Sequence, residues 1–348
     1  MIDIQAAYMR RALQIARGGL GNVAPNPMVG AVIVVDDKIV GEGYHRRWGE
    51  AHAEVNAVAS VKDPALLRRA TMYVTLEPCS HYGKTPPCAK LIIDSGIPRV
   101  VVGCLDPFEK VSGRGVTMLR DAGVEVATGV LEDECRELNR VFMTAHSKRR
   151  PFVTLKWAMS ADGYMDCVRT PDQPSAKFST RTTKTLVHLL RSRHEAIMVG
   201  SGTVIYDNPR LDVRGVAGRQ PVKVVLDMAG RVSAEATVFA SGCTLYFGPE
   251  RRDLPAGVER MALDETPSVE SILSRLYESG ITSLLVEGGA ETHRRFIESG
   301  HWDDCRVEIS PVKLGENGRC KMNLPIGEIE IESEKDGNKI VLIRNISF

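Results

Sequence analysis

A histidine, a glutamate and two cysteines are spaced so that they could hold a metal ion and move protons. His52 and Glu54 lie two residues apart, and Cys79 and Cys88 follow them in a polar stretch rich in glycine and proline. One imidazole and two thiolates are typical zinc ligands, and three protein ligands leave the fourth tetrahedral position open for water. Zinc lowers the pKa of that water toward neutrality and so supplies a hydroxide nucleophile. A carboxylate such as Glu54 can shuttle protons there without binding the metal.

The order of these residues is the pattern of zinc deaminases, in which His-x-Glu is followed by Pro-Cys and a second cysteine. We therefore predict that His52, Cys79 and Cys88 bind zinc and that Glu54 is the catalytic proton shuttle in the loss of an amino group from a nucleobase-like ring. One alternative is a closed structural zinc site with His81 as the fourth ligand. The other is a pair of unrelated cysteines beside a solvated glutamate.

Two predicted helices place ligands near their starts. An alanine-rich helix is expected over residues 51–60 and a second helix over 87–95, so His52 and Cys88 fall in first turns. Helix N-termini favour anionic ligands such as thiolate and hydroxide. The helix dipoles are therefore expected to support the zinc site.

The elements around this site alternate along the chain. An amphipathic helix begins near Ala7 and ends at Gly18, and further helices are predicted over 114–121 and 132–145. Strands are predicted over residues 29–35, 39–44, 71–76, 99–104 and 124–128. Strands that alternate with helices predict a layered α/β domain.

A second series of alternating strands and helices is predicted after the basic cluster Lys148-Arg149-Arg150, which a proline follows. At 348 residues the chain exceeds the usual size of one domain, so we predict a domain over 1–146 and a second over 151–348. In the second, helices are predicted over 183–191, 269–279 and 291–299. Its strands are predicted over 152–157, 196–199, 222–226, 244–247, 283–286, 306–309 and near 340–343.

Composition excludes several classes of protein. Hydrophobic residues make up 43% and charged residues 26% of the chain, which is ordinary for a globular protein. The formal net charge is +1, so the broad basic surface of a nucleic-acid-binding protein is missing. Residues 1–17 lack the apolar core of a signal peptide, and no run is long enough to span a membrane. Most of the eight cysteines stand among apolar neighbours, as inert thiols of a cytoplasmic protein do.

The spacing of the cysteines and several flanking motifs resemble one family, the bifunctional deaminase/reductases of riboflavin biosynthesis. Eight residues separate Cys79 from Cys88, whereas the common form of the motif is Cys-x-x-Cys. The motifs that carry the resemblance in this half are Asn26-Pro27-Met28-Val29-Gly30, Gly41-Glu42-Gly43-Tyr44-His45, Thr75-Leu76-Glu77-Pro78, Thr85-Pro86-Pro87, Asp106-Pro107 and Gly113-Arg114-Gly115. The resemblance implies a cytidine-deaminase-like, three-layer α/β/α domain with one zinc ion per chain.

By this resemblance the substrate is a small molecule, a diaminopyrimidinone that carries ribose 5-phosphate and loses a ring amino group as ammonia. Asn26 is then suited to the edge of the base, and His45 and Lys84 to the phosphate. Taken alone, Asn26 would be a turn residue and Lys84 a solvated loop charge. Phe108 stands where the family has an asparagine, which removes one polar contact.

The second half resembles the reductase half of the same family. Its glycine-rich segments, Gly200-Ser201-Gly202 and Glu287-Gly288-Gly289, are by themselves weak signals that fit tight structural turns. The matching motifs are Leu155-Lys156, Asp162-Gly163, His188-Leu189-Leu190-Arg191, Val199-Gly200-Ser201-Gly202-Thr203-Val204, Asp207-Asn208-Pro209-Arg210-Leu211 and Val286-Glu287-Gly288-Gly289. They imply a dihydrofolate-reductase-like α/β domain that uses NADPH to reduce the ribosyl group to ribityl.

The resemblance also implies the residues of the reductase site. Lys156 would act on the opened ribose as a catalytic residue, although alone it would be a strand lysine with an exposed tip. The expected substrate contacts are Ser175, Arg191, Leu211, Arg214 and Glu287. The expected NADPH contacts are Met159, Lys177, Thr203, Asp207, Gly289, Ala290, Glu291, Thr292, His293, Arg294 and Arg295. Lys177-Phe178-Ser179 departs from the family's Trp-Ile-Ser, and Asp212 replaces its threonine.

Three other functions remain as alternatives. The second half could have lost catalysis and only shape an oligomer, against which Lys156, Asp207 and Glu287 argue. A nucleic-acid editing deaminase shares the His-x-Glu chemistry but needs a basic groove. A zinc-stabilised nucleotide-binding module would depend on zinc for folding. We expect the bifunctional enzyme, as a homo-oligomer formed through the reductase domain, with no nucleic-acid or membrane partner.

Overall fold

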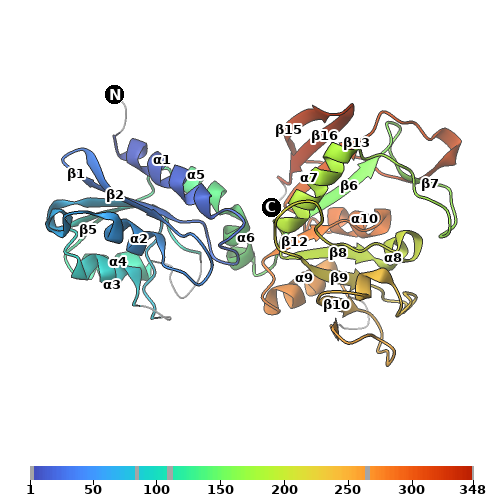
Figure 1. Cartoon of the computed structure of the whole chain (residues 1–348), viewed down its shortest axis with the longest axis horizontal. Coiled ribbons are helices and arrows are strands. Elements are labelled where there is room, and N and C mark those ends of the chain that lie inside the picture. The colour runs from blue at the N-terminus through green and yellow to red at the C-terminus, as the bar shows by residue number, and fades with distance from the viewer. Residues whose placement is uncertain (1–3, 83–85, 108–112, 263–266, 347–348) are drawn as a thin grey trace. The chain divides into compact units, whose positions relative to one another are not determined.

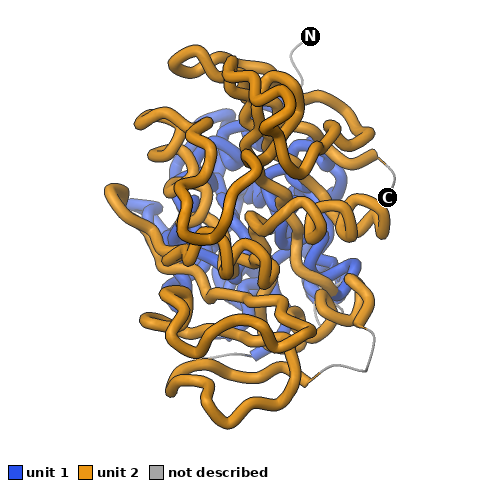
Figure 2. Tube along the Cα trace, turned by 90° about the vertical axis from the view of Figure 1, so that its right-hand side faces the viewer, with its two compact units in different colours: residues 1–149 blue, residues 150–348 orange. Residues whose placement is uncertain are grey.

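The chain divides into two compact units, residues 1–149 and 150–348, coloured separately in Figure 2. The structure is a computed structural model that describes residues 4–82, 86–107, 113–262 and 267–346. Each unit has its own sheet and its own hydrophobic core. The division falls inside the segment where the basic cluster meets Pro151.

The first unit is built on a five-stranded sheet in the order β2-β1-β3-β4-β5 (Figure 1). Strand β1 is antiparallel to β2 and β3, whereas β3, β4 and β5 are parallel. β1 is valine-rich and buried throughout, as expected of a central strand that packs on both faces. The strands are β1 (Gly30–Val35), β2 (Lys38–Tyr44), β3 (Thr71–Leu76), β4 (Arg99–Cys104) and β5 (Glu125–Thr128).

Helices cover both faces of this sheet. Met9 of α1 and Cys135 of α5 pack with Val32 on one face, and Ala57 of α2 packs with Ile33 on the other. Because successive residues of a strand point to opposite faces of the sheet, a single strand contributes side chains to both hydrophobic cores. The helices are α1 (Ile4–Ala16) and α5 (Glu132–Leu138) on the first face, and α2 (Ala53–Ser60), α3 (Cys88–Asp94) and α4 (Arg114–Asp121) on the second. The predicted three-layer α/β/α arrangement is confirmed.

The prediction of a single helix over 132–145 is wrong, because the helix is interrupted at Asn139 and the segment forms two helices, α5 and α6 (Arg140–Lys148). The Asn139 side chain is almost fully buried, and its Oδ1 accepts a hydrogen bond from the Met28 amide at 2.8 Å. Its Nδ2 donates to the Met28 carbonyl, also at 2.8 Å. This pairing with a distant backbone segment leaves no trace in the helical periodicity, so the sequence did not indicate the break.

The second unit contains a nine-stranded sheet in the order β11-β10-β9-β8-β12-β6-β13-β16-β15. The strands from β11 to β13 in that order are parallel, and β16 and β15 add antiparallel pairs at one edge. The strands are β6 (Phe152–Met159), β8 (Ala196–Gly200), β9 (Val222–Leu226), β10 (Thr244–Phe247), β11 (Val258–Arg260), β12 (Ser283–Val286), β13 (Asp304–Ile309), β15 (Glu328–Lys335) and β16 (Asn338–Arg344). Parallel strands bring their carboxyl ends to one edge of the sheet.

Four helices accompany this sheet: α7 (Arg181–Ser192), α8 (Ser201–Asp207), α9 (Val269–Glu278) and α10 (Ala290–Glu298). Leu276 of α9 and Phe296 of α10 pack with Trp157 in the core on one face, and Val204 of α8 belongs to the core on the other. The sequence did not predict α8, because a glycine pair at its start lowers helix propensity and favours a turn.

Several strands of the second unit were also missed: β7 (Tyr164–Cys167), β14 (Gly318–Lys321), β11 and β15. β7 and β14 pair only with each other, and β11 and β15 lie at the two edges of the large sheet. Nearly all of β15 is exposed, with alternating glutamate and isoleucine. β7, β11 and β14 are short and carry no apolar run, so the sequence pattern does not reveal them, whereas the alternation in β15 is a strand signal that the prediction missed. No helix in the described ranges is long and apolar enough to cross a membrane.

Replacing Asn139 by alanine should destabilise the first unit. Both hydrogen bonds to Met28 would be lost, and leaving buried polar groups unpaired costs about 1–3 kcal/mol each. We expect a lower midpoint in urea unfolding and faster hydrogen exchange of the peptide that contains Met28. The exposed Asn22 provides the matched control, and equal effects of N139A and N22A would contradict this role.

Candidate functional site

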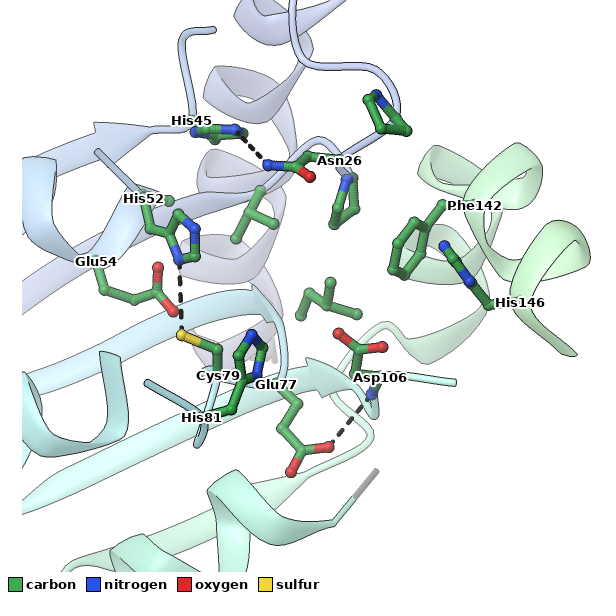
Figure 3. Close-up of a pocket in the computed structure, with 15 residues that line it drawn as sticks. Asn26, His45, His52, Glu54, Glu77, Cys79, His81, Asp106, Phe142 and His146 are labelled. Carbon is green, nitrogen blue, oxygen red and sulfur yellow. Dashed lines mark hydrogen bonds between the residues drawn. The ribbon is translucent and has the colours of Figure 1, made fainter. Parts of the chain in front are cut away.

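The predicted zinc ligands lie together in the first unit: His52 and Cys79 line a cavity of about 390 Å3 (Figure 3), and the Sγ atom of Cys88 lies beside their ligand atoms. His52 is the N-cap residue of α2, rather than part of its first turn as predicted, and Cys88 is the first residue of α3. Cys79 lies in the turn that follows β3. The described residues that line the cavity are Pro25, Asn26, Pro27, Val29, His45, His52, Ala53, Glu54, Leu76, Glu77, Cys79, His81, Asp106, Phe142 and His146.

The spacing of the three donor atoms fits zinc. His52 Nδ1 lies 3.7 Å from the Sγ atom of Cys79 and 3.3 Å from that of Cys88. Ordinary Zn–N and Zn–S bond lengths in a tetrahedral site give a nitrogen-to-sulfur distance of about 3.6 Å. The ligand atoms of all three residues lie within 4.8 Å of one another, and His81 is not part of this cluster. The cluster therefore matches the open three-ligand site and gives no support to His81 as a fourth ligand.

The start of α3 favours negative charge on the ligands. The Cys88 amide donates a hydrogen bond to the Cys79 Sγ at 3.3 Å. The pKa of the Cys79 thiol is lowered, chiefly by a hydrogen bond from the Cys88 thiol and then by His52. One thiolate is thus already favoured by the protein, as metal binding requires.

Glu54 is buried beside the ligands, and its carboxylate points toward them in Figure 3. Burial, together with the negative charge of Cys79, raises the pKa of this carboxyl group to about 7. Glu54 is not one of the three ligand residues of the cluster. Its position matches that of a carboxylate that exchanges protons next to the metal.

Asn26 and His45 form a hydrogen-bonded pair in the same cavity. His45 Nδ1 lies 3.1 Å from the Ala51 carbonyl, so it carries the proton, and Nε2 can accept from Asn26 Nδ2 at 3.3 Å. Burial lowers the pKa of His45 below its usual value. A neutral His45 offers weaker electrostatic attraction to phosphate than the sequence suggested. Lys84 and Phe108, also named from the sequence, lie outside the described residues.

The wall across the cavity from the ligands comes from α6, and no sequence motif indicated a function for these residues. Phe142 and His146 contact each other edge to face, with ring centroids 4.4 Å apart. Figure 3 places both rings on the far side of the cavity from His52 and Glu54. They are four residues apart on a helix, which resembles an ordinary amphipathic spacing.

Glu77 is the other residue whose role the sequence did not reveal. Its buried carboxylate accepts backbone hydrogen bonds from four residues, at 2.9 to 3.3 Å: Asp106, Gly113, Gly115 and Val116. Glu77 thereby ties the turn that carries Cys79 to the start of α4. A Cβ on Gly115 would lie 2.0 Å from the Pro78 carbonyl, which explains the glycine in that motif.

A second cavity, of about 570 Å3, lies in the second unit. It is lined by residues from the ends of β6, β8 and β12 and from the starts of α8 and α10. Many of the residues implied for substrate and cofactor line it: Lys156, Ser175, Lys177, Thr203, Asp207, Glu287, Gly289, Ala290, Glu291, Thr292 and Arg294. The structure therefore brings most of the expected reductase residues together.

A buried charged group surrounds Lys156. Arg191 donates two hydrogen bonds to the Glu287 carboxylate, at 2.8 and 2.7 Å, and a third to the Asp212 carbonyl. Burial lowers the pKa of Lys156, against the attraction of Glu287. Arg191 is thus held by a carboxylate rather than left free for phosphate.

Asp207 is held by Arg169, a residue that the sequence did not single out. The Arg169 side chain is almost completely buried and binds both Asp166, at 2.6 Å, and Asp207. It also donates to the Tyr206 carbonyl at 2.9 Å. Asp207 therefore reaches the cavity as part of an ion pair.

Some expected reductase contacts lie apart from the described lining of this cavity. Met159, Leu211 and His293 are buried in the protein, and the His293 ring stacks on Trp157. The Arg214 guanidinium is paired with Asp212, and Arg295 is paired with Glu291 at 3.2 Å. Ligand contacts by these residues stay predictions.

Comparison with known proteins identifies both halves of the chain. Residues 151–342 match the family described as RibD C-terminal domain, and residues 3–104 match the cytidine and deoxycytidylate deaminase zinc-binding region. The riboflavin biosynthesis protein RibD of Aquifex aeolicus is 40% identical over 97% of this chain and 94% of its own length. The chain belongs to the RibD family.

RibD proteins of known structure share the whole fold. A diaminohydroxyphosphoribosylaminopyrimidine deaminase/5-amino-6-(5-phosphoribosylamino)uracil reductase from Thermotoga maritima is 39% identical, with a TM-score of 0.86, over 98% of this chain and 99% of its own. RibD from Acinetobacter baumannii is 32% identical, with a TM-score of 0.88, over 99% of both chains. The chain is thus a bifunctional deaminase and reductase of riboflavin biosynthesis, with zinc and NADPH as cofactors. This confirms the family, fold class and activities expected from the sequence, and the alternative functions are not favoured.

Replacing Glu77 by glutamine should loosen the turn that carries Cys79. In either orientation of the amide, its NH2 group faces two backbone N–H groups that now have no acceptor, which costs about 2–6 kcal/mol in total. We expect a lower thermal midpoint and faster hydrogen exchange at residues 113–116. The exposed Glu125 is the matched control, and unchanged exchange in E77Q would show that this carboxylate is dispensable.

Proposed function

We propose that the first unit removes the ring amino group of 2,5-diamino-6-ribosylamino-4(3H)-pyrimidinone 5′-phosphate as ammonia, and that the second unit then reduces the ribosyl group to ribityl. The observation that carries the first step is the cluster of His52, Cys79 and Cys88 at a cavity that Glu54 also lines. The similar Thermotoga protein bears the names of both activities. The deaminase domain would comprise residues 1–146 and the reductase domain 151–348.

In the deaminase half, His52, Cys79 and Cys88 would hold the metal and Glu54 would move protons. When bound, zinc supplies the Lewis acidity that makes water a nucleophile near neutral pH. The Glu54 carboxylate takes a proton from the attacking water and delivers it to the leaving amino nitrogen. Its burial supports this assignment, because a buried carboxyl group exchanges protons more readily near neutral pH.

The rest of this cavity would orient the substrate. Asn26 offers an amide to the edge of the base, and its contact with the His45 ring supports a fixed orientation. His45 and Lys84 are proposed to lie near the phosphate, with Lys84 supplying the charge. Phe142 and His146 close the cavity opposite Glu54 and would exclude water from the ring.

In the reductase half, NADPH supplies the hydride when bound, and the residues of this chain orient the reactants. Lys156 would donate a hydrogen bond to the opened ribose and supply a proton to the ribose oxygen. Glu287, fixed by Arg191, supports Lys156 from the end of β12. Ser175 would contact substrate, and Lys177, Thr203, Asp207 and the start of α10 would contact the cofactor.

We also propose a cytoplasmic location and a homo-oligomer formed through the reductase domain. Thiol ligands at Cys79 and Cys88 require a reducing compartment, which supports the first proposal. The edge strand β15 exposes Ile329 and Ile331, with 52% and 50% of their surface accessible, which supports the second.

Replacing Glu54 by glutamine should abolish deamination and leave reduction intact. Loss of a proton-transfer group costs about 10²- to 10⁴-fold in rate, while the three metal ligands remain. The measurements are ammonia release, zinc content and NADPH oxidation with the already deaminated intermediate. The exposed Glu50 provides the control E50Q, and loss of both activities in E54Q would contradict two separate sites.

Removing zinc with a chelator should stop ammonia release and spare NADPH oxidation with the deaminated intermediate. Ammonia release should return when zinc is added back. The variant H81A should still bind one zinc ion per chain by metal analysis, because His81 lies outside the ligand cluster. Zinc loss in H81A would instead identify a closed structural site.

A further inference from the structure

The reductase cavity has an excess of positive charge that the proposed catalytic residues do not explain. Each carboxylate that lines it, Asp166, Asp207, Glu287 and Glu291, already has an arginine partner. Among the lining residues, Lys156, Lys177, Lys184 and Arg319 have no carboxylate partner within the described part of the chain. Such a cavity favours a ligand that carries several negative charges.

Arg319 differs from the two exposed lysines of this set. It lies on β14, is half-buried, and places its guanidinium carbon 4.4 Å from the centre of the Tyr206 ring. Arg169 lies 5.5 Å from the centre of the same ring, where it is engaged with Asp166 and Asp207. Arg319 has therefore lost part of its hydration without gaining a carboxylate in exchange.

Stacking on Tyr206 also fixes the direction in which Arg319 can bind. A guanidinium placed over a ring keeps its N–H groups in its own plane, where they can reach an acceptor beside the ring. A planar fork of N–H donors matches the oxygens of a phosphate group. Lys177 and Lys184 are exposed, flexible point charges and lack this preset geometry.

We propose that Arg319, presented by Tyr206, is a phosphate-binding residue of the reductase cavity. The inference rests on the proposed reductase function, whose cofactor and substrate both carry phosphate groups. The phosphate belongs to one of them: the 2′-phosphate or the pyrophosphate of the dinucleotide, or the 5′-phosphate of the substrate. Arg319 thereby contributes a ligand contact from a strand that the sequence did not predict.

A purely structural role for Arg319 is the competing explanation, because stacking could simply attach β14 to α8. The same strand offers a matched control: Lys321 lies 5.5 Å from the centre of the Tyr164 ring but does not line the cavity. Removing the charge of Lys321 should disturb its contact with the Tyr164 ring without affecting the binding of any ligand.

The test compares R319M, R319K and K321M in the full chain. NADPH binding is measured by its fluorescence, and steady-state reduction is measured with the deaminated intermediate. Each variant is assayed with NADPH, with NADH, and with the intermediate before and after removal of its phosphate. R319M should raise the Kd or KM of a phosphate-bearing ligand about 10- to 100-fold, the value of a charged hydrogen bond, with kcat within about twofold. R319K should show a smaller increase, and K321M should resemble the unmodified chain.

The pattern of losses identifies the phosphate. A loss with NADPH but not NADH points to the 2′-phosphate, an equal loss with both to the pyrophosphate, and a loss that disappears with the dephosphorylated intermediate to the substrate. The proposal is overturned if R319M matches K321M for every ligand, whether or not the two variants melt at lower temperature. Failure of the unmodified chain to bind or oxidise NADPH would instead overturn the reductase function itself.

Discussion

Both cavities depend on one constraint of parallel sheets, namely that neighbouring strands end at the same edge. In the first unit, β3 leads to Cys79 and β4 leads to Asp106, and the carboxylate of Glu77 joins the two connections through backbone hydrogen bonds. In the second unit, Lys156 lies in the last half of β6, and β12 leads to Glu287. Side chains distant in sequence therefore meet at strand ends, where loops can vary without disturbing the core.

Three buried glutamates show how the surroundings of a carboxyl group decide its use. Within the described residues, Glu54 has no lysine or arginine partner, and its surroundings, with burial as the largest cause, raise its pKa to about 7. Glu77 is surrounded by backbone N–H groups and serves to hold two segments together. Glu287 is fixed by two hydrogen bonds from Arg191, which lower its pKa although burial alone would raise it. Only the first of these environments suits proton transfer.

The departures from the family pattern have local consequences in the reductase half. The carboxylate of Asp212 binds both Arg210, at 3.1 Å, and Arg214, so these arginines are less available to a phosphate. Its backbone carbonyl also accepts a hydrogen bond from Arg191. Lys177 is exposed and lines the same cavity as Arg319, so both add positive charge there. The positive charge available to a phosphate therefore comes less from the expected arginines and more from other residues of the cavity.

By itself, the sequence indicated the candidate zinc ligands, Glu54 as the candidate proton shuttle, and most of the strands and helices. Only a few residue types bind zinc, which restricts the candidate ligands. Buried strands and helices repeat apolar residues with a characteristic period, which is visible in the local sequence. Only the tertiary structure decided the roles of Glu77, Asn139, Arg169 and Arg319. Glu77 and Asn139 bind backbone groups far away in the chain, Arg169 binds the distant Asp207 carboxylate, and Arg319 contacts the Tyr206 ring. Such contacts are set by how strands and loops pack, and no local pattern of residues encodes them.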